Sequence, residues 1–353
     1  MYASIKIAVL DDYNNLSPEY TSNLPSNLDI TVYNDTILPV PDPQPLIDRL
    51  KPYEILVTMR ERTPLPAKII DSLPNLKLIL TTGLRNRGID IAAAKKRGIQ
   101  VAGTPGPKTP PGLPPNFTAT TQHTIALILS LVSNIPRDHT IISSNPTPEW
   151  IHYLPLNTFL GGLTLGILGL GKLGIGTARI ASLAFGMKII AWSPNLNQER
   201  ADQSAIEANL PKGTFKVVSK EDLFKISDVI SLHIVLSEST KDIVKKNDLD
   251  LMKSNSFIVN TSRGPLINEN DLLSILEKGK IRGAALDVFD IEPLPADSKW
   301  RTTDWGKNGK SQVVLTPHTG YSYEDSLKAM WEGTKENLER IAQGNAVKWV
   351  IEP

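Results

Sequence analysis

The chain has 353 residues, a formal net charge of +1 and no cysteine, with 41% hydrophobic and 21% charged residues. These values are typical of a globular protein of two domains; they exclude disulfides and thiolate metal sites and offer no basic field to nucleic acid or anionic lipid. No apolar run approaches the ~20 residues that cross a bilayer. We therefore expect a cytoplasmic protein without a membrane partner and, from its charge and lack of cysteine, without a nucleic-acid partner or a bound metal.

The first hundred residues alternate strand-like apolar runs with amphipathic stretches. This alternation predicts βαβ units in a parallel sheet covered by helices on both faces. The proline-rich run 104–115 then predicts a stiff connector. A helix over 118–135 follows, and its apolar residues on most faces predict burial between domains or subunits. The predicted strands are 5–10, 29–33, 54–58, 76–81 and 99–102, and the predicted helices are 45–50, 66–73 and 89–97.

A polar loop through Trp150 and Leu156 precedes a second alternating series. This series predicts a second doubly wound sheet, so the expected fold class is α/β with two such domains. The predicted strands are 163–168, 187–191, 215–218, 229–233, 257–260, 284–288 and 313–315, and the predicted helices are 172–185, 221–226, 269–278 and 322–342.

A glycine-rich turn joins the strand 163–168 to the helix 172–185. In this context Gly169 permits a tight turn, Gly171 lets the backbone approach a pyrophosphate, and Gly174 lets the helix pack on the strand. Free N–H groups at the helix N-terminus favour the phosphates. The turn therefore predicts a dinucleotide site, with a glycine turn that only packs as the alternative.

The end of the next strand distinguishes NAD from NADP, because an acid there holds the ribose hydroxyls of NAD and repels a 2′-phosphate. No acid occurs there before Glu199. Ser193 and Asn195 offer hydrogen bonds to a phosphate, and Arg200 offers charge, although no arginine adjoins Ser193. We therefore expect NAD(P), with NADP(H) favoured over NAD(H).

Three motifs in the second half supply reactive side chains at strand ends, where open α/β sheets bind ligands. Arg263 follows the strand 257–260, and its guanidinium suits a planar carboxylate. His318 follows the strand 313–315 and is suited to proton transfer near neutral pH. Glu292 is the natural partner of this imidazole. Each residue alone fits a structural role; jointly they predict a site for a 2-keto or 2-hydroxy acid.

Through these motifs and 81–90 in the first domain, nearly the whole chain resembles the D-isomer-specific 2-hydroxyacid dehydrogenases. The resemblance implies a Rossmann nucleotide-binding domain, residues 118–322, inserted into a flavodoxin-like substrate domain, residues 1–117 and 323–353. It also implies a homodimer that associates through the nucleotide-binding domain. The chain departs from the family at Val235, where proline is frequent, and at Gln122, where glutamate is usual.

The implied activity is the reversible, NAD(P)H-dependent reduction of 2-keto acids to D-2-hydroxy acids. By resemblance, Arg263 anchors the substrate carboxylate, His318 is the acid/base and Glu292 supports it. Alternatives are a nucleotide-sensing, corepressor-like binding protein and a formate- or phosphite-type dehydrogenase on the same scaffold. Further expected substrate contacts are Arg60, Gly83, Leu84 and Arg85; expected cofactor contacts are Gly169, Gly171, Lys172, Leu173, Gly174, Ser193, Asn195, His233, Thr240, Thr261 and Asp287.

Overall fold

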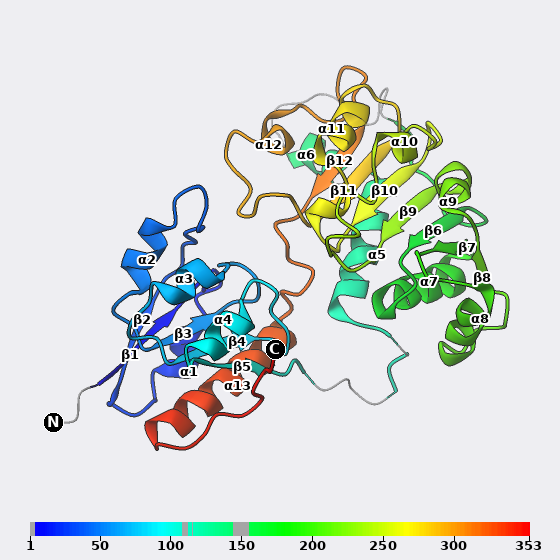
Figure 1. Cartoon of the computed structure of the whole chain (residues 1–353). Helices are drawn as coiled ribbons and strands as arrows, with labels where there is room; N and C mark the ends of the chain where they lie inside the picture. Colours follow the sequence, from blue (N-terminus) through cyan, green and yellow to red (C-terminus); the bar gives the residue numbers. More distant parts are fainter. Residues whose placement is uncertain (1–3, 108–111, 115, 144–154) are drawn as a thin grey trace. The chain divides into compact units, whose positions relative to one another are not determined.

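The computed structural model describes residues 4–107, 112–114, 116–143 and 155–353 (Figure 1). The chain divides into two compact units: unit 1 comprises Met1–Thr109 and Tyr323–Pro353, and unit 2 comprises Pro110–Ser322. Trp150 of the predicted polar loop lies outside the described residues. No helix in the described ranges has both the length and the apolar character needed to span a membrane.

Unit 1 is built on a five-stranded sheet in the order β2-β1-β3-β4-β5, with every strand pair parallel. This is the 2-1-3-4-5 order of flavodoxin-like folds, which confirms the predicted fold class. The strands are β1 (Ile5–Val9), β2 (Leu28–Val32), β3 (Ile55–Thr58), β4 (Leu78–Thr82) and β5 (Gln100–Thr104), and the helices are α1 (Ser17–Thr21), α2 (Gln44–Leu50), α3 (Ala67–Asp71), α4 (Ile91–Lys96) and α13 (Glu324–Ala342).

The core of unit 1 fills both faces of this sheet. Helices α2, α3 and α4 pack on one face through Leu50, Ile69 and Ala94, which lie in one apolar cluster with Leu56 of β3. The C-terminal helix α13 contacts β4, β5 and α1. On this helix Trp331 is only 1% exposed, and its ring centroid lies 6.1 Å from that of Tyr20. Trp331 is therefore a core residue of unit 1.

Unit 2 is built on a seven-stranded sheet in the order β12-β11-β10-β9-β6-β7-β8, again with every pair parallel. Counted from β6, this is the 3-2-1-4-5-6 Rossmann order with a seventh strand. The strands are β6 (Thr164–Leu168), β7 (Lys188–Trp192), β8 (Phe215–Val217), β9 (Val229–Leu232), β10 (Phe257–Asn260), β11 (Gly283–Leu286) and β12 (Gln312–Leu315).

Two apolar clusters cover the two faces of the unit 2 sheet, because neighbouring residues of each strand point to opposite faces. Val259 joins the cluster under α5, α7 and α8, and Ile258 joins the cluster under α9, α10 and α11. The helices are α5 (Ala119–Val132), α6 (Ile135–Ser143), α7 (Lys172–Phe185), α8 (Gln198–Glu207), α9 (Lys220–Ile226), α10 (Lys246–Leu249), α11 (Glu269–Glu277) and α12 (Lys299–Thr302), with a 3-10 turn at Gly264–Leu266.

One sequence-based expectation is corrected in this unit, and another stays a prediction. Helix α5 contacts α7 and strands β10, β11 and β12, and its residues Leu127, Ile128, Leu131 and Val132 lie within the core of unit 2. Ile125 and Leu129 are partly buried, so the expected burial between domains or subunits stays a prediction. The beginning of the predicted polar loop is instead α6, which carries Pro136 in its first turn. Proline is tolerated at that position, because the first N–H groups of a helix have no intrahelical acceptor.

Candidate active site

The glycine turn lies between β6 and α7, where the strand order reverses and Rossmann sheets bind ligands. Gly169 has φ +104°, and a Cβ there would lie 2.6 Å from the Ile234 nitrogen and 2.7 Å from the His233 carbonyl carbon. Gly171 is the N-cap of α7 and has no side-chain cap, and a Cβ built on it would meet no atom within 4 Å. Gly174 packs against the Gly169 carbonyl. The open, uncapped helix N-terminus fits a pyrophosphate.

The predicted nucleotide contacts Ser193 and Asn195 follow β7, and Lys172 and Leu173 form the first turn of α7. Ser193 is partly buried, and Asn195 is exposed. The guanidinium of Arg200 donates to the Asn195 carbonyl at 3.0 Å. This bond places a positive charge in the loop after β7.

His233 directly follows β9, and Thr240 lies seven residues further along the chain; both are buried. Burial lowers the pKa of His233 to about 4, so this imidazole is neutral at pH 7. Its Nε2 lies 2.9 Å from the Ser231 hydroxyl. The Thr240 hydroxyl donates to the Val235 carbonyl at 2.7 Å and accepts from the Ser237 N–H at 2.7 Å. Thr240 therefore closes its own turn, and its sequence-based assignment as a cofactor contact stays a prediction.

Arg263 lies in a loop that the preceding residues hold rigidly. The Asn260 amide donates to the Arg263 carbonyl at 2.9 Å and accepts from the Ser262 N–H at 3.0 Å. Buried Thr261 shares a 2.8 Å hydroxyl–hydroxyl bond with Thr124 of α5. The Arg263 guanidinium itself donates to the Ser262 carbonyl at 2.7 Å. The loop at the end of β10 is thus fixed both by its own Asx turn and by a helix.

Glu292 and His318, which were predicted as partners, are in direct contact. Nδ1 of His318 lies 2.5 Å from one carboxylate oxygen of Glu292, and the other oxygen accepts from the Phe289 N–H at 2.8 Å. Both side chains are about one-fifth exposed, at 20% and 21%. The backbone of His318 has φ +54°, an uncommon conformation for a residue other than glycine. The surrounding loop therefore holds this histidine in a strained conformation.

Asp287 is the hydrogen-bonding centre of the His318 loop. It is 1% exposed and accepts bonds from the Thr316 hydroxyl (2.6 Å) and from the N–H groups of Thr319 (2.8 Å) and Gly320 (2.9 Å). A ring nitrogen of His123, on α5, lies 3.2 Å from the same carboxylate. Desolvation would raise the pKa of Asp287, but these hydrogen bonds outweigh it and hold the pKa below its usual value.

The Arg263 and Glu292 loops also touch each other. A Cβ on Gly264 would lie 2.6 Å from the Asp290 nitrogen and closer still to the Phe289 carbonyl group. Only a residue without a side chain permits this approach. The loop after β10 and the loop after β11 therefore have a fixed spacing.

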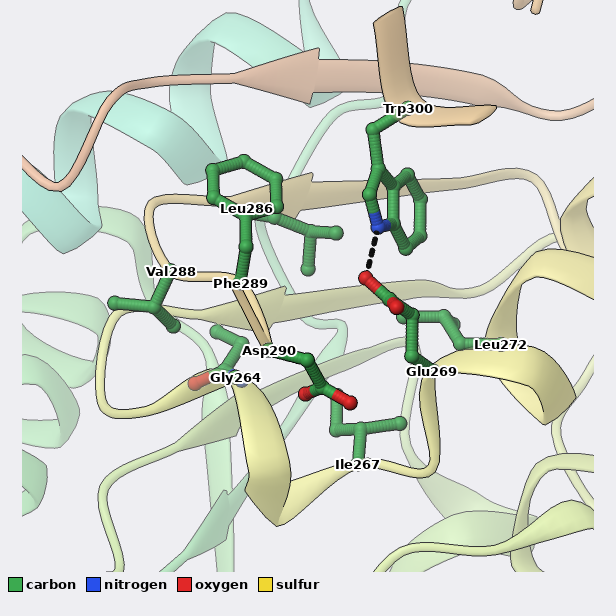
Figure 2. A pocket seen from close by; sticks show the side chains of 10 residues that line it. Gly264, Ile267, Glu269, Leu272, Leu286, Val288, Phe289, Asp290 and Trp300 are labelled. Atoms are coloured by element: carbon green, nitrogen blue, oxygen red, sulfur yellow. Dashed lines mark hydrogen bonds between the residues drawn. The ribbon is translucent and has the colours of Figure 1, made fainter. Parts of the chain in front are cut away.

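Behind this contact lies a cavity of about 20 Å³ (Figure 2), room for about one water molecule. Asp290 and Glu269 both line it, and the Trp300 indole N–H donates to Glu269 at 2.6 Å. Burial, with the charges of Glu269 and Asp242, raises the pKa of Asp290 to about 6. Trp300 lies on α12, so this short helix packs against Phe289 of the Glu292 loop through an aromatic side chain. The other lining residues are Asn260, Gly264, Ile267, Leu272, Leu286, Val288 and Phe289.

In unit 1, the predicted substrate residues Arg60 and Gly83 lie against each other after β3 and β4. The Arg60 guanidinium occupies the space that a Cβ on Gly83 would need, and Gly83 has φ +90°. The Arg60 N–H donates to the Thr82 hydroxyl at 2.9 Å, and the Asn86 amide donates to the Arg60 carbonyl at 2.5 Å. Asn86 was not singled out from the sequence, although it lies within the 81–90 motif.

Leu84 and Arg85 line an open hollow of about 550 Å³ in unit 1. Leu84 is 51% exposed. The C-terminal residues Trp349, Val350, Ile351 and Glu352 form another wall of this hollow. No motif pointed to these C-terminal residues, because they reach the hollow through an antiparallel bridge between Ala102 and Val350, which are far apart in the chain.

The parallel sheet of unit 2 and its open glycine turn define a Rossmann domain of the dinucleotide-binding type. A family model described as the NAD-binding domain of D-isomer-specific 2-hydroxyacid dehydrogenases matches residues 125–320. The chain belongs to the D-isomer-specific 2-hydroxyacid dehydrogenase family.

Individual relatives agree with this assignment. The chain is 34% identical over 307 residues to a glyoxylate reductase from Thermococcus litoralis, covering 85% of this chain and 83% of that one. It is 32% identical over 306 residues to a D-3-phosphoglycerate dehydrogenase from Methanocaldococcus jannaschii, covering 87% of this chain and 53% of that one. The chain thus spans about half the length of that relative. A crystal structure of a phosphoglycerate oxidoreductase from Vibrio cholerae superimposes with a TM-score of 0.80 at 33% identity, covering 96% and 99% of the two chains.

Proposed function

We propose that the protein reduces a 2-keto acid to the D-2-hydroxy acid, reversibly, with NAD(P)H. The observation that carries this proposal is the 2.5 Å contact between His318 Nδ1 and Glu292, whose loop adjoins the Arg263 loop at Gly264. The family membership and relatives such as the glyoxylate reductase support the same reaction class.

In this proposal the Glu292 carboxylate orients the imidazole through its contact with Nδ1, so that His318 Nε2 faces the keto oxygen and gives it a proton. Arg263 pairs with the substrate carboxylate through its two-pronged guanidinium. A reduced nicotinamide, when bound at the glycine turn, supplies the hydride that the keto carbon gains. In the reverse direction His318 Nε2 takes the hydroxyl proton.

We assign Arg60, Gly83, Leu84 and Arg85 to the substrate as well, which makes unit 1 the substrate domain and unit 2 the nucleotide-binding domain. The N–H groups of the turn at Gly83 suit a carboxylate. The strained backbone of Arg60, with φ +51°, supports a positional role for this loop.

The preference for NADP(H) is part of this proposal. It is supported by the absence of an acid in the described loop residues 193–198 after β7 and by the Arg200–Asn195 bond, which brings a guanidinium into that loop. A homodimer through unit 2 and a cytoplasmic location are proposed from the family resemblance. Sedimentation of the purified protein and cell fractionation test these two points.

The deciding experiment measures steady-state rates with glyoxylate, pyruvate, hydroxypyruvate and phenylpyruvate against NADH and NADPH. His318→Gln should lower kcat/KM by about 10²–10⁴-fold, the usual cost of losing a positioned general acid. His139→Gln, on the exposed surface of α6, is the matched control. Near-wild-type turnover in His318→Gln would refute the assignment of His318 as the acid/base.

The same assay separates the alternatives. Tight binding of NADH or NADPH without turnover of any keto acid would favour a nucleotide-sensing binding protein. Reduction of NAD⁺ or NADP⁺ by formate or phosphite would favour the formate- or phosphite-type dehydrogenase.

A further inference from the structure

His123 lies outside the residues assigned above but reaches the centre of the His318 loop. It is on α5, and its Nε2 lies 3.2 Å from an Asp287 carboxylate oxygen and 3.1 Å from the Thr316 hydroxyl. Its side chain is 14% exposed, and that of Asp287 is 1% exposed. The two residues are 164 positions apart in the sequence.

The hydrogen bonds define the tautomer of this histidine. Asp287, whose pKa is lowered, is a carboxylate and can only accept. The Thr316 hydroxyl gives its proton to Asp287 at 2.6 Å, so its oxygen faces His123 as an acceptor. Because both neighbours accept, Nε2 of His123 must carry a proton and donate it.

Asp287 in turn shapes the loop that carries His318. It accepts hydrogen bonds from the N–H groups of Thr319 and Gly320, the two residues that directly follow His318. Gly320 is enclosed so closely that a Cβ on it would lie 2.9 Å from Asp287 and 3.4 Å from the His123 ring. The strained φ of His318 is therefore maintained by a carboxylate whose own position depends on a donor from α5.

We propose that His123 is a positioning residue for the acid/base His318. Its Nε2–H holds the Asp287 carboxylate in the orientation in which the carboxylate accepts hydrogen bonds from the Thr319 and Gly320 N–H groups. These bonds position the loop and so set the direction of the His318 ring. This inference rests on the proposed function for its catalytic consequence, while its structural part is independent of any turnover.

The test compares three substitutions at one position in the full-length protein. A glutamine amide can reach the place of Nε2–H, whereas an asparagine amide is too short and a leucine has no donor. We expect His123→Leu and His123→Asn to lower kcat by about 10–100-fold, the cost of misplacing a reacting group by about 1 Å, with KM for the keto acid changed less than threefold. His123→Gln should retain most of wild-type kcat, and His139→Leu is the surface control.

A second measurement needs no activity. Amide hydrogen exchange over residues 316–322 should be faster in the leucine and asparagine variants than in wild type, and restored in the glutamine variant, because the Thr319 and Gly320 amides lose an ordered acceptor. Equal exchange and equal kcat in all four proteins would overturn the inference, as would equal losses in glutamine and leucine variants. If wild type reduces no keto acid, the proposed function fails, and the exchange data alone decide the role of His123. If the leucine variant does not fold, the glutamine–asparagine pair gives the same comparison.

Discussion

The contact between Gly264 and the backbone of Phe289 and Asp290 makes Gly264→Ala the most specific perturbation of this site. The added methyl group would lie 2.6 Å from the Asp290 nitrogen, whereas comfortable contacts of carbon are about 3.5–4.0 Å. The neighbours are backbone atoms, so no side-chain rotation relieves the overlap. One of the two loops must move by about 1 Å.

The size of the effect follows from this displacement. Overpacking of a filled site costs about 1–3 kcal/mol of unfolding free energy, and each kcal/mol lowers Tm by roughly 2–4 °C in a unit of this size. Moving Arg263 relative to Glu292 and His318 by about 1 Å should lower kcat/KM for a keto acid by about 100-fold. The glycine turn is on a different strand, but Thr261 and Asp287 are expected cofactor contacts in the displaced loops, so the Kd for NADPH should change by less than kcat/KM does.

The assay combines thermal unfolding, NADPH titration and steady-state kinetics of the variant. Gly106→Ala is the control, because a Cβ there would meet only the Met330 Cε at 3.9 Å, an ordinary contact. If Gly264→Ala keeps both the Tm and kcat/KM of the control, the spacing of these loops does not govern activity and the reasoning is refuted.

Three further predictions concern single side chains. Arg263→Lys should raise KM for the keto acid steeply and lower kcat, since an ammonium lacks the two-pronged geometry; unchanged KM would mean that the carboxylate is held by Arg60 or Arg85. Ser193→Asp should reverse a preference for NADPH by opposing the 2′-phosphate; wild-type preference for NADH by tenfold, about 1.4 kcal/mol, would contradict our interpretation of the loop. Because the pKa of Asp290 is raised to about 6 in the fold, its ionisation costs stability above pH 6 and costs little near pH 4. Asp290→Asn should therefore raise Tm at pH 8 and leave it nearly unchanged at pH 4. The gain in unfolding free energy at pH 8 should be at most about 1 kcal/mol, because solvent reaches and screens part of this partly buried carboxyl; a gain that is larger at pH 4 contradicts this sign.

Local signals predicted the strands and the glycine turn well. Helix α7 has the predicted bounds, Lys172–Phe185, because glycines lie at both ends: Gly171 is its N-cap, and Gly186 has φ +65° at its C-cap. Helix α6 lies where a polar loop was predicted; Pro136, a residue that commonly ends a helix, lies in the first turn of this one. Glycine thus marked both ends of α7, whereas the effect of Pro136 on the helix depends on the residues around it.

The arrangement of the candidate site was only partly predictable. The pairing of Glu292 with His318 followed from their places at strand ends, and the contact is present. His123 was passed over although its neighbour Gln122 was noted, because its partners Asp287 and Thr316 come from β11 and β12, far along the chain. The spacing of residues in the sequence does not predict such long-range contacts unless the order of the strands in the sheet is known.

The strand order of unit 2 separates two tasks. Strands β10, β11 and β12, which precede the loops of Arg263, Glu292 and His318, lie together at one side of the sheet, whereas β7, which precedes Ser193, lies beyond both β9 and β6. Because β9 and β6 lie between Ser193's strand and the strands of the Arg263, Glu292 and His318 loops, the free-energy effects of changes at the two places should add. If Ser193 and the three loops have the roles proposed above, the nucleotide preference can change during evolution, or in engineering, without rebuilding the loops that carry Arg263, Glu292 and His318.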